Sequence, residues 1–195
     1  MIAELAERAE NIRGGKVDPA TDNMLRVTND GRKLALDQKL MNPLLPDDDN
    51  GKVASCAANV YRIWEESRDK RLTQLVFCDL STPNSDKFNM YDNLKNKLIA
   101  KGVSVNEIAF IHSADTEAKK KELFTRVRKG QIRILMGSTQ KMGSGTNCQG
   151  RLIALHDLDV PWRPSDLEQR PPNSLPPIKM SLRPKSLNYV TSGNT

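Results

Sequence analysis

The stretch TQLVFCDLSTP, residues 73–83, decides the fold of this chain. Residues 73–80 form a short, largely apolar run without the strict alternation of a half-exposed strand, which is typical of a strand buried on both faces. Similar runs follow in EIAFIH (107–112), IRILMG (132–137) and RLIALHD (151–157). The sequence therefore predicts four buried strands.

Segments with helical periodicity separate the first three of these strands. After residue 83, apolar side chains recur at three- and four-residue intervals, and the charged segment 113–130 repeats this pattern. Gly102 and Gly130 follow these segments, where a left-handed residue commonly ends a helix. The residues expected to face inward are Met90, Leu94, Leu98, Ile99, Ala118, Leu123, Phe124 and Val127. Because parallel strands need crossover connections, this order predicts an α/β fold, a parallel sheet with flanking helices.

The rest of the chain divides around this region. We expect residues 1–70 to form a helical lead-in, whose apolar stripe includes Val53, Cys56, Ala57, Val60, Ile63 and Trp64. Residues 71–170 hold the predicted sheet. Residues 171–195 contain five of the eleven prolines and no acidic residue. Since proline cannot continue a helix, an irregular or disordered tail is expected there.

Composition limits the classes of protein to which the chain can belong. Its net charge of +6 suits a polyanionic partner, although scattered Lys and Arg would give the same sum. No apolar run reaches the roughly 20 residues of a membrane span, and the first residues lack a signal-peptide pattern, so we expect a cytoplasmic protein without a membrane partner. The three cysteines are far apart, and His112 and His156 stand at no metal-ligand spacing from them, so no metal site is expected.

Polar residues follow three of the predicted strands. Ser81 and Thr82 come after the first, His112 and Ser113 after the second, and GSTQKMGSGTN (137–147) after the third. The carboxyl ends of parallel strands meet at one edge of a sheet, which is where ligands bind in such folds. We therefore expect these residues to share one binding site.

The loop 137–147 has a composition that suits phosphate. Gly143 and Gly145 let the backbone approach a ligand closely, and Lys141 supplies a cation. The short hydrogen-bonding side chains of the loop are Ser138, Thr139, Thr146 and Asn147. A G-x-G pattern also occurs in many ordinary turns, and this loop is neither a Walker A loop nor a dinucleotide fingerprint. From the loop alone, a phosphate site and an ordinary turn both stay open.

The order of the motifs adds a family resemblance. The chain resembles the second RecA-like lobe of superfamily-two helicases, in the Swi/Snf-type branch, through three successive segments: TQLVFCDLSTP, IAFIHSADTEAKKKELFTRVRKGQIRILMGSTQKMGSGTN and LIALHDLDVPWRPSDLEQR. Within that branch it resembles the helicase region of methylase–helicase fusion proteins found on phages and other mobile elements. The resemblance runs from Leu72 to Arg170, and residues 1–71 look like the family's segment that leads into this lobe.

The resemblance implies roles for individual residues. Those that would contact the nucleic-acid backbone are Ser81, Thr82, Ser138, Thr139 and Lys141. Those that would bind the nucleotide or couple it to the nucleic acid are Gly143, Gly145, Thr146, Asn147 and Gln169, with Asp159 and Trp162 as further structural and coupling positions. Arg170 would be the catalytic remnant of motif six, which neutralises charge on the transferred phosphoryl group. The implied ligands are DNA and, in a complete two-lobe enzyme, ATP with Mg²⁺.

The chain departs from the family in two respects. After Arg170 it reads PPNSLPPIKM where the family has further arginines, and losing an arginine finger lowers the rate by about 10³–10⁵. The first lobe, with its phosphate-binding lysine and acidic pair, does not precede this one. We therefore expect a fragment of an ATP-dependent DNA helicase or translocase that is inactive without a first lobe as partner. Two alternatives stay open: a non-enzymatic module that binds nucleic acid or protein, and a Rossmann-type transferase that uses the glycine loop for a small cofactor.

Overall fold

The computed structural model describes residues 1–84, 86–143, 149–159 and 185–188. The chain divides into two compact units, Met1–Asp48 and Asp49–Thr195. No helix within the described ranges combines the length and the hydropathy that crossing a membrane requires.

The boundary between the units lies earlier than residue 70, where the sequence analysis expects it. The reason is α3 (Lys52–Glu66), which belongs to the larger unit. Its apolar stripe is buried, with Val53, Cys56, Ala57, Val60 and Ile63 each at most 3% exposed. The predicted stripe is therefore part of the core of the larger unit, except for Trp64, which is only half-buried.

The smaller unit consists of two helices, α1 (Ile2–Arg13) and α2 (Met24–Leu36), followed by the 3-10 turn η1 (Gln38–Leu40). Arg8 of α1 donates hydrogen bonds to the Asp22 carboxylate at 2.7 and 3.0 Å, and to Asp30 of α2 at 3.1 Å. Few apolar side chains of these helices are buried, so this ion-pair cluster contributes to their association.

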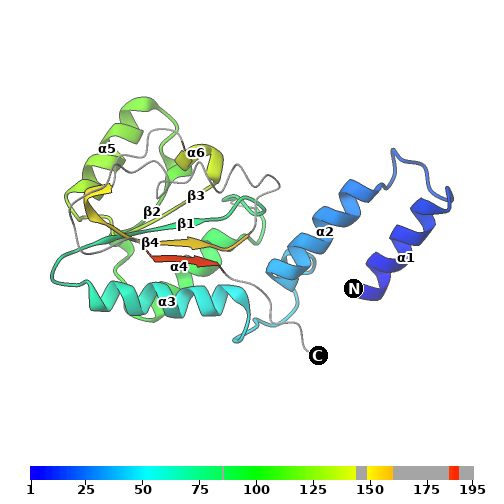
Figure 1. Ribbon diagram of the computed structural model, residues 1–195, viewed down its shortest axis with the longest axis horizontal. Coiled ribbons are helices and arrows are strands. Elements are labelled where there is room, and N and C mark those ends of the chain that lie inside the picture. Colours follow the sequence, from blue (N-terminus) through cyan, green and yellow to red (C-terminus); the bar gives the residue numbers. More distant parts are fainter. Residues whose placement is uncertain (85, 144–148, 160–184, 189–195) are drawn as a thin grey trace. The chain divides into compact units, whose positions relative to one another are not determined.

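The larger unit is built on a parallel sheet of five strands in the order β2-β3-β1-β4-β5 (Figure 1). The strands are β1 (Thr73–Phe77), β2 (Ile108–Phe110), β3 (Ile134–Gly137), β4 (Leu152–Asp157) and β5 (Lys185–Asn188). Every neighbouring pair is parallel. The α/β fold and the four strands predicted from the sequence are confirmed.

The fifth strand corrects one expectation. β5 lies in the segment 171–195, which the sequence analysis expects to be irregular, and it pairs with β4 from Lys185 opposite Ala154 to Asn188 opposite Asp157. Residues 171–184 and 189–195 lie outside the described residues.

The strand order bears on the Rossmann-type alternative. β1 lies between β3 and β4, whereas both common nucleotide-binding orders of doubly wound sheets place β2 beside β1. The topology therefore disfavours a dinucleotide-binding fold.

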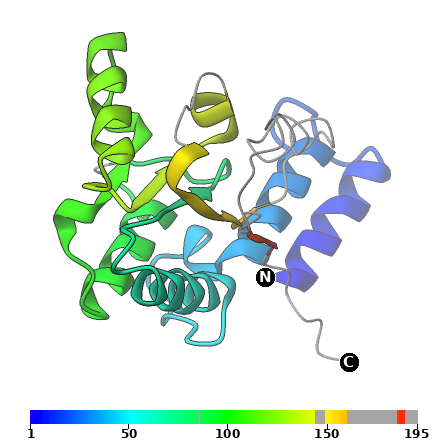
Figure 2. The ribbon, with the colours of Figure 1, turned by 60° about the vertical axis from the view of Figure 1, so that its left-hand side comes forward.

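Helices cover both faces of the sheet (Figures 1 and 2). α3 and α4 (Met90–Ala100) lie on one face, and α5 (Glu117–Arg128) lies on the other. A single apolar cluster fills the α5 side, and its members include Leu75, Phe77, Leu123, Phe124, Val127, Leu135 and Leu155. Since both faces are covered, all five side chains of β1 are buried, as the unbroken apolar run predicts.

A polar pair is buried in the sheet. Gln74 and His156 are both 0% exposed. The Gln74 amide donates to the Val60 carbonyl of α3 at 2.9 Å, and its oxygen lies 2.8 Å from His156 Nε2. Burial lowers the pKa of His156 to about 4, so the imidazole is neutral at pH 7. His156 is thus a hydrogen-bonded core residue, as predicted.

The glycines predicted to follow α4 and α5 do so, but two residues expected to face inward are exposed. Asn89 and Thr116 cap α4 and α5 by accepting backbone N–H bonds, and Gly102 and Gly130 have φ of +103° and +71° after those helices. However, Ile99 is 39% exposed and Ala118 is exposed as well. Ile99 follows Leu98 by one residue, which turns it about 100° away from the buried stripe.

Candidate nucleic-acid interface

The strands place three polar loops next to one another at the carboxyl edge of the sheet. Phe77, at the end of β1, pairs with Gly137 of β3 on one side and with Asp157 of β4 on the other. The loops that begin after these residues therefore leave the sheet side by side. This arrangement is the one that the sequence predicted for Ser81, Thr82 and the loop 137–147.

Two carboxylates tie these loops together. Asp159, after β4, accepts the N–H of Asp79 at 3.0 and 2.8 Å and the N–H of Leu80 at 2.5 Å. The Asp79 side chain in turn accepts the N–H of Thr139 at 2.7 Å and its hydroxyl at 2.6 Å. We call Asp79 and Asp159 the carboxylate bridge. Because hydrogen bonds to a charged acceptor are strong, this bridge fixes the loops after β1, β3 and β4 relative to one another.

Three of the five residues expected to contact nucleic acid form hydrogen bonds within the fold. Ser81 is 8% exposed, and its hydroxyl accepts the Met90 N–H at 3.0 Å, at the start of α4. Ser138 is 9% exposed and accepts the Lys141 N–H at 3.4 Å. Thr139 is held by Asp79. These three hydroxyls stabilise the loops, and the side chains that remain exposed are those of Thr82 and Lys141.

The residues expected near the nucleotide lie mostly outside the described part of the chain. Gly143 ends the short helix α6 (Thr139–Gly143). The residues that lie outside the described ranges are Gly145, Thr146, Asn147, Trp162, Gln169 and Arg170. Their roles stay predictions.

His112 adds a hydrogen-bonding group to this edge. Its ring is half-buried and packs edge-on against Tyr91, with the ring centroids 5.2 Å apart, and Tyr91 donates to the Cys78 carbonyl at 2.6 Å. Within the described residues, His112 Nδ1 has no hydrogen-bond partner. Burial lowers the pKa of His112, the charge of Lys141 lowers it further, and Asp79 acts in the opposite direction. His112 is therefore a neutral imidazole at pH 7.

Sequence reasoning missed Asp79, Tyr91 and Lys52 at this edge. Burial lowers the pKa of Lys52 at the start of α3, and the Asp159 charge opposes that shift, so the lysine charge acts on the carboxylate bridge. Burial also raises the pKa of the Cys78 thiol well above its usual value, which keeps it neutral. Asp79 could have been predicted from the sequence, because it is an acidic residue just after a buried strand. Lys52 could not have been predicted, since it is distant in sequence from the loops of this edge.

No family model matches the sequence, and no curated protein matches it. Among solved structures, the C-terminal part of the Fun30 ATPase domain is similar with a TM-score of 0.50 and 16% identity, over 82% of this chain and 48% of that one. The Hef helicase domain of Pyrococcus furiosus has a TM-score of 0.48 and 12% identity, over 98% and 36%. The C-terminal domain of the DEAD-box protein Dbp5 has a TM-score of 0.43 and 12% identity, over 68% and 70%.

The likeness to Fun30 concerns the fold. The chain spans about half the length of that structure and has an α/β, RecA-like fold.

Proposed function

We propose that this chain is the second lobe of an ATP-dependent DNA helicase or translocase, and that it supplies DNA-backbone contacts and coupling between lobes. The observation that carries the proposal is the carboxylate bridge. It joins the loops after β1, β3 and β4 at the edge where parallel sheets bind ligands, while leaving Thr82 and Lys141 exposed. A lobe that must respond to DNA and nucleotide together needs such a connection between its loops.

In this proposal each exposed group has a simple task. The Lys141 ammonium attracts a DNA phosphate, and the Thr82 hydroxyl donates a hydrogen bond to a phosphate oxygen. The carboxylate bridge then transmits a shift of the Thr82 loop to α6, and from there to the glycine loop at Gly143 and Gly145.

ATP and Mg²⁺ belong to the complete two-lobe enzyme in this proposal. Within the described residues, no group of three or more His, Cys, Asp or Glu could hold a metal ion, so these residues do not fit a resident Mg²⁺. Gln169 and Arg170 would face a nucleotide bound by the first lobe. The isolated chain is therefore proposed to have no ATPase activity of its own.

Two assays test the proposal. DNA-stimulated ATP hydrolysis is measured for the chain alone and after adding a separately produced first lobe. DNA affinity is measured for the wild type, Lys141→Gln and the exposed control Lys16→Gln from the smaller unit. We expect Lys141→Gln to weaken binding and to reduce the slope of log affinity against log salt by about 1. Equal affinities for the two variants would contradict the proposed interface.

The alternative is a non-enzymatic module, which would use the same exposed Thr82 and Lys141 at the carboxyl edge but would need no first lobe. It predicts DNA or protein binding that no added first lobe and no nucleotide changes. The same two assays therefore decide between the two functions.

A further inference from the structure

The amino edge of the sheet, opposite the candidate interface, collects arginines. Arg71 lies two residues before β1, while Arg133 and Arg151 directly precede β3 and β4. Glu107 directly precedes β2. Because all these strands are parallel, residues in front of them gather at one edge of the sheet.

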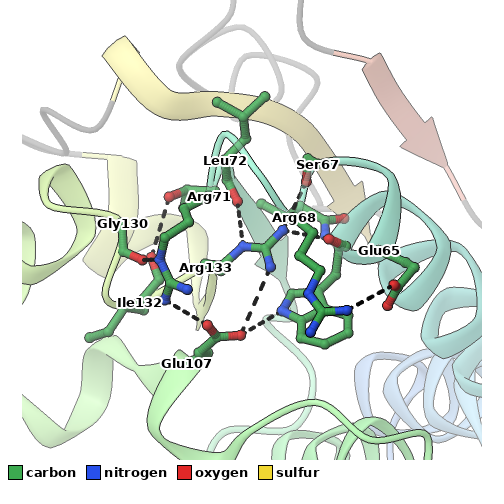
Figure 3. A network of polar contacts seen from close by, with 12 residues as sticks. Glu65, Ser67, Arg68, Arg71, Leu72, Glu107, Gly130, Ile132 and Arg133 are labelled. Atoms are coloured by element: carbon green, nitrogen blue, oxygen red, sulfur yellow. Dashed lines mark hydrogen bonds and ion pairs between the residues drawn. The ribbon is translucent and has the colours of Figure 1, made fainter.

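In the inner part of this edge, the charges of Arg133 and Glu107 have hydrogen-bond partners (Figure 3). Arg133 is 1% exposed and donates to Ser67 Oγ at 3.0 Å, to the Leu72 carbonyl at 3.4 Å and to the carbonyl of Trp64. Glu107, whose side chain is 12% exposed, accepts the Trp64 indole N–H and an Arg71 N–H, both at 2.6 Å. The buried Arg133 guanidinium therefore has a largely buried carboxylate close by, 4.0 Å away.

The outer part has two arginines that are fixed in place, Arg151 by backbone carbonyls and Arg71 by a carbonyl and the Glu107 carboxylate. Arg151 donates to the carbonyls of Arg128 and Lys70 at 2.7 and 2.8 Å. Arg71 donates to the Gly130 carbonyl at 2.8 Å, and its side chain is 47% exposed. Carbonyls carry only partial charge, so the bonds of Arg151 orient its guanidinium group and leave most of its positive charge, whereas Glu107 offsets the charge of Arg71.

The backbone beneath these arginines is held firmly. Arg71 has φ of +48°, in the left-handed region that is uncommon for residues other than glycine. Its bonds to Gly130 and Glu107 hold that conformation. Gly130 itself has φ of +71°, and a Cβ there would lie 3.1 Å from Arg71 atoms. The turns before β1 and after α5 are therefore locked against each other.

We infer that this surface binds the phosphate backbone of DNA at a second location, separate from the carboxyl edge. We define the amino-edge surface as Lys70, Arg71, Arg126, Arg128, Lys129 and Arg151. Four of these side chains, Lys70, Arg126, Arg128 and Lys129, belong to exposed residues next to the fixed arginines. Planar guanidinium forks match phosphate geometry, and ammonium groups add point charges. DNA is the polyanion that this combination fits, because the cations come from the end of α5 and from the segments before β1 and β4 and so present an array.

The test compares two triple variants with the same change in charge. Lys70→Gln/Arg126→Gln/Lys129→Gln removes three exposed cations of the amino-edge surface and leaves the guanidinium–carbonyl bonds intact. Lys119→Gln/Lys120→Gln/Lys121→Gln removes three cations from the other part of the same helix, α5. Affinity for a duplex DNA is measured from 50 to 200 mM salt, and thermal unfolding checks that both variants fold.

We expect the first variant to weaken DNA binding by about tenfold or more and to reduce the salt slope by about 2–3, and the second to change affinity much less. Equal losses in the two variants would overturn the inference, as would an unchanged first variant. Tighter binding to vesicles that contain phosphatidylserine, or to polyglutamate, than to DNA would overturn it too. Lys141→Gln keeps the two interfaces distinguishable. If only Lys141→Gln weakens binding, the amino-edge surface is excluded; if only the first triple variant does, the carboxyl-edge interface is excluded.

Discussion

The two edges of the sheet stabilise charge in opposite ways. At the carboxyl edge, the carboxylates of Asp79 and Asp159 accept bonds from backbone N–H groups. At the amino edge, Arg71, Arg133 and Arg151 donate to backbone carbonyls. The direction of the chain explains the difference, because helices between parallel strands start at the carboxyl edge and end at the amino edge. Unpaired N–H groups therefore collect at one edge and unpaired carbonyls at the other. In this fold, carboxylates bind the unpaired N–H groups at one edge, and guanidinium groups bind the unpaired carbonyls at the other.

The largest expected effect concerns the buried arginine of the amino edge. Replacing Arg133 by Met leaves the Trp64 and Leu72 carbonyls and the Ser67 hydroxyl without this donor, so the free energy of unfolding should fall by about 3–5 kcal/mol. Urea denaturation measures this loss. The exposed Arg126→Gln is the matched control and should stay within about 0.5 kcal/mol. A loss below about 1 kcal/mol for Arg133→Met would show that the network contributes little.

A second prediction concerns pH and the sheet between the two edges. The pKa of His156 is about 4 in the folded chain, below its unfolded value. The unfolded state therefore binds the proton first as pH falls, and stability should drop by up to about 3 kcal/mol between pH 6.5 and 4. His156→Gln removes this titration, so its unfolding free energy should fall less over the same range. Parallel pH profiles for wild type and variant would contradict the assignment.

The carboxyl edge should show a smaller effect. Asp159→Ala leaves the N–H groups of Asp79 and Leu80 without an acceptor, which should lower the free energy of unfolding by about 2 kcal/mol. Hydrogen exchange at those two amides should accelerate. Asp159→Asn keeps one acceptor oxygen and should lose less. If exchange at residues 79 and 80 is the same in all three proteins, the bridge does not hold the loop.

The smallest effect tests the reassignment of Ser81. Its hydroxyl accepts the first N–H of α4, so Ser81→Ala should cost about 1 kcal/mol of stability, as the loss of a helix cap does. The neighbouring Thr82→Ala should leave stability nearly unchanged and weaken DNA binding. The reverse pattern, with Ser81 important only for DNA, would restore the role predicted from the sequence.

The fold was more predictable than the site, for a physical reason. The runs around Leu75 and Leu135 have to be buried on both faces, so their local pattern determined strand and topology together. β5 could not be found this way, because KSLN is too short and polar to show a strand pattern. The hydroxyls of Ser81, Ser138 and Thr139 could equally face DNA or a loop amide. That choice depends on Asp79 and Met90, which only the folded chain brings to them.

The central claim is that this lobe works only as part of a two-lobe, DNA-dependent ATPase. The most direct measurement is ATP hydrolysis in the presence of DNA, for the chain alone and with a separately produced first lobe. The account predicts background rates for the chain alone, and a DNA-dependent increase with the first lobe that Lys141→Gln reduces. Hydrolysis by the chain alone, above background and sensitive to DNA, would contradict it.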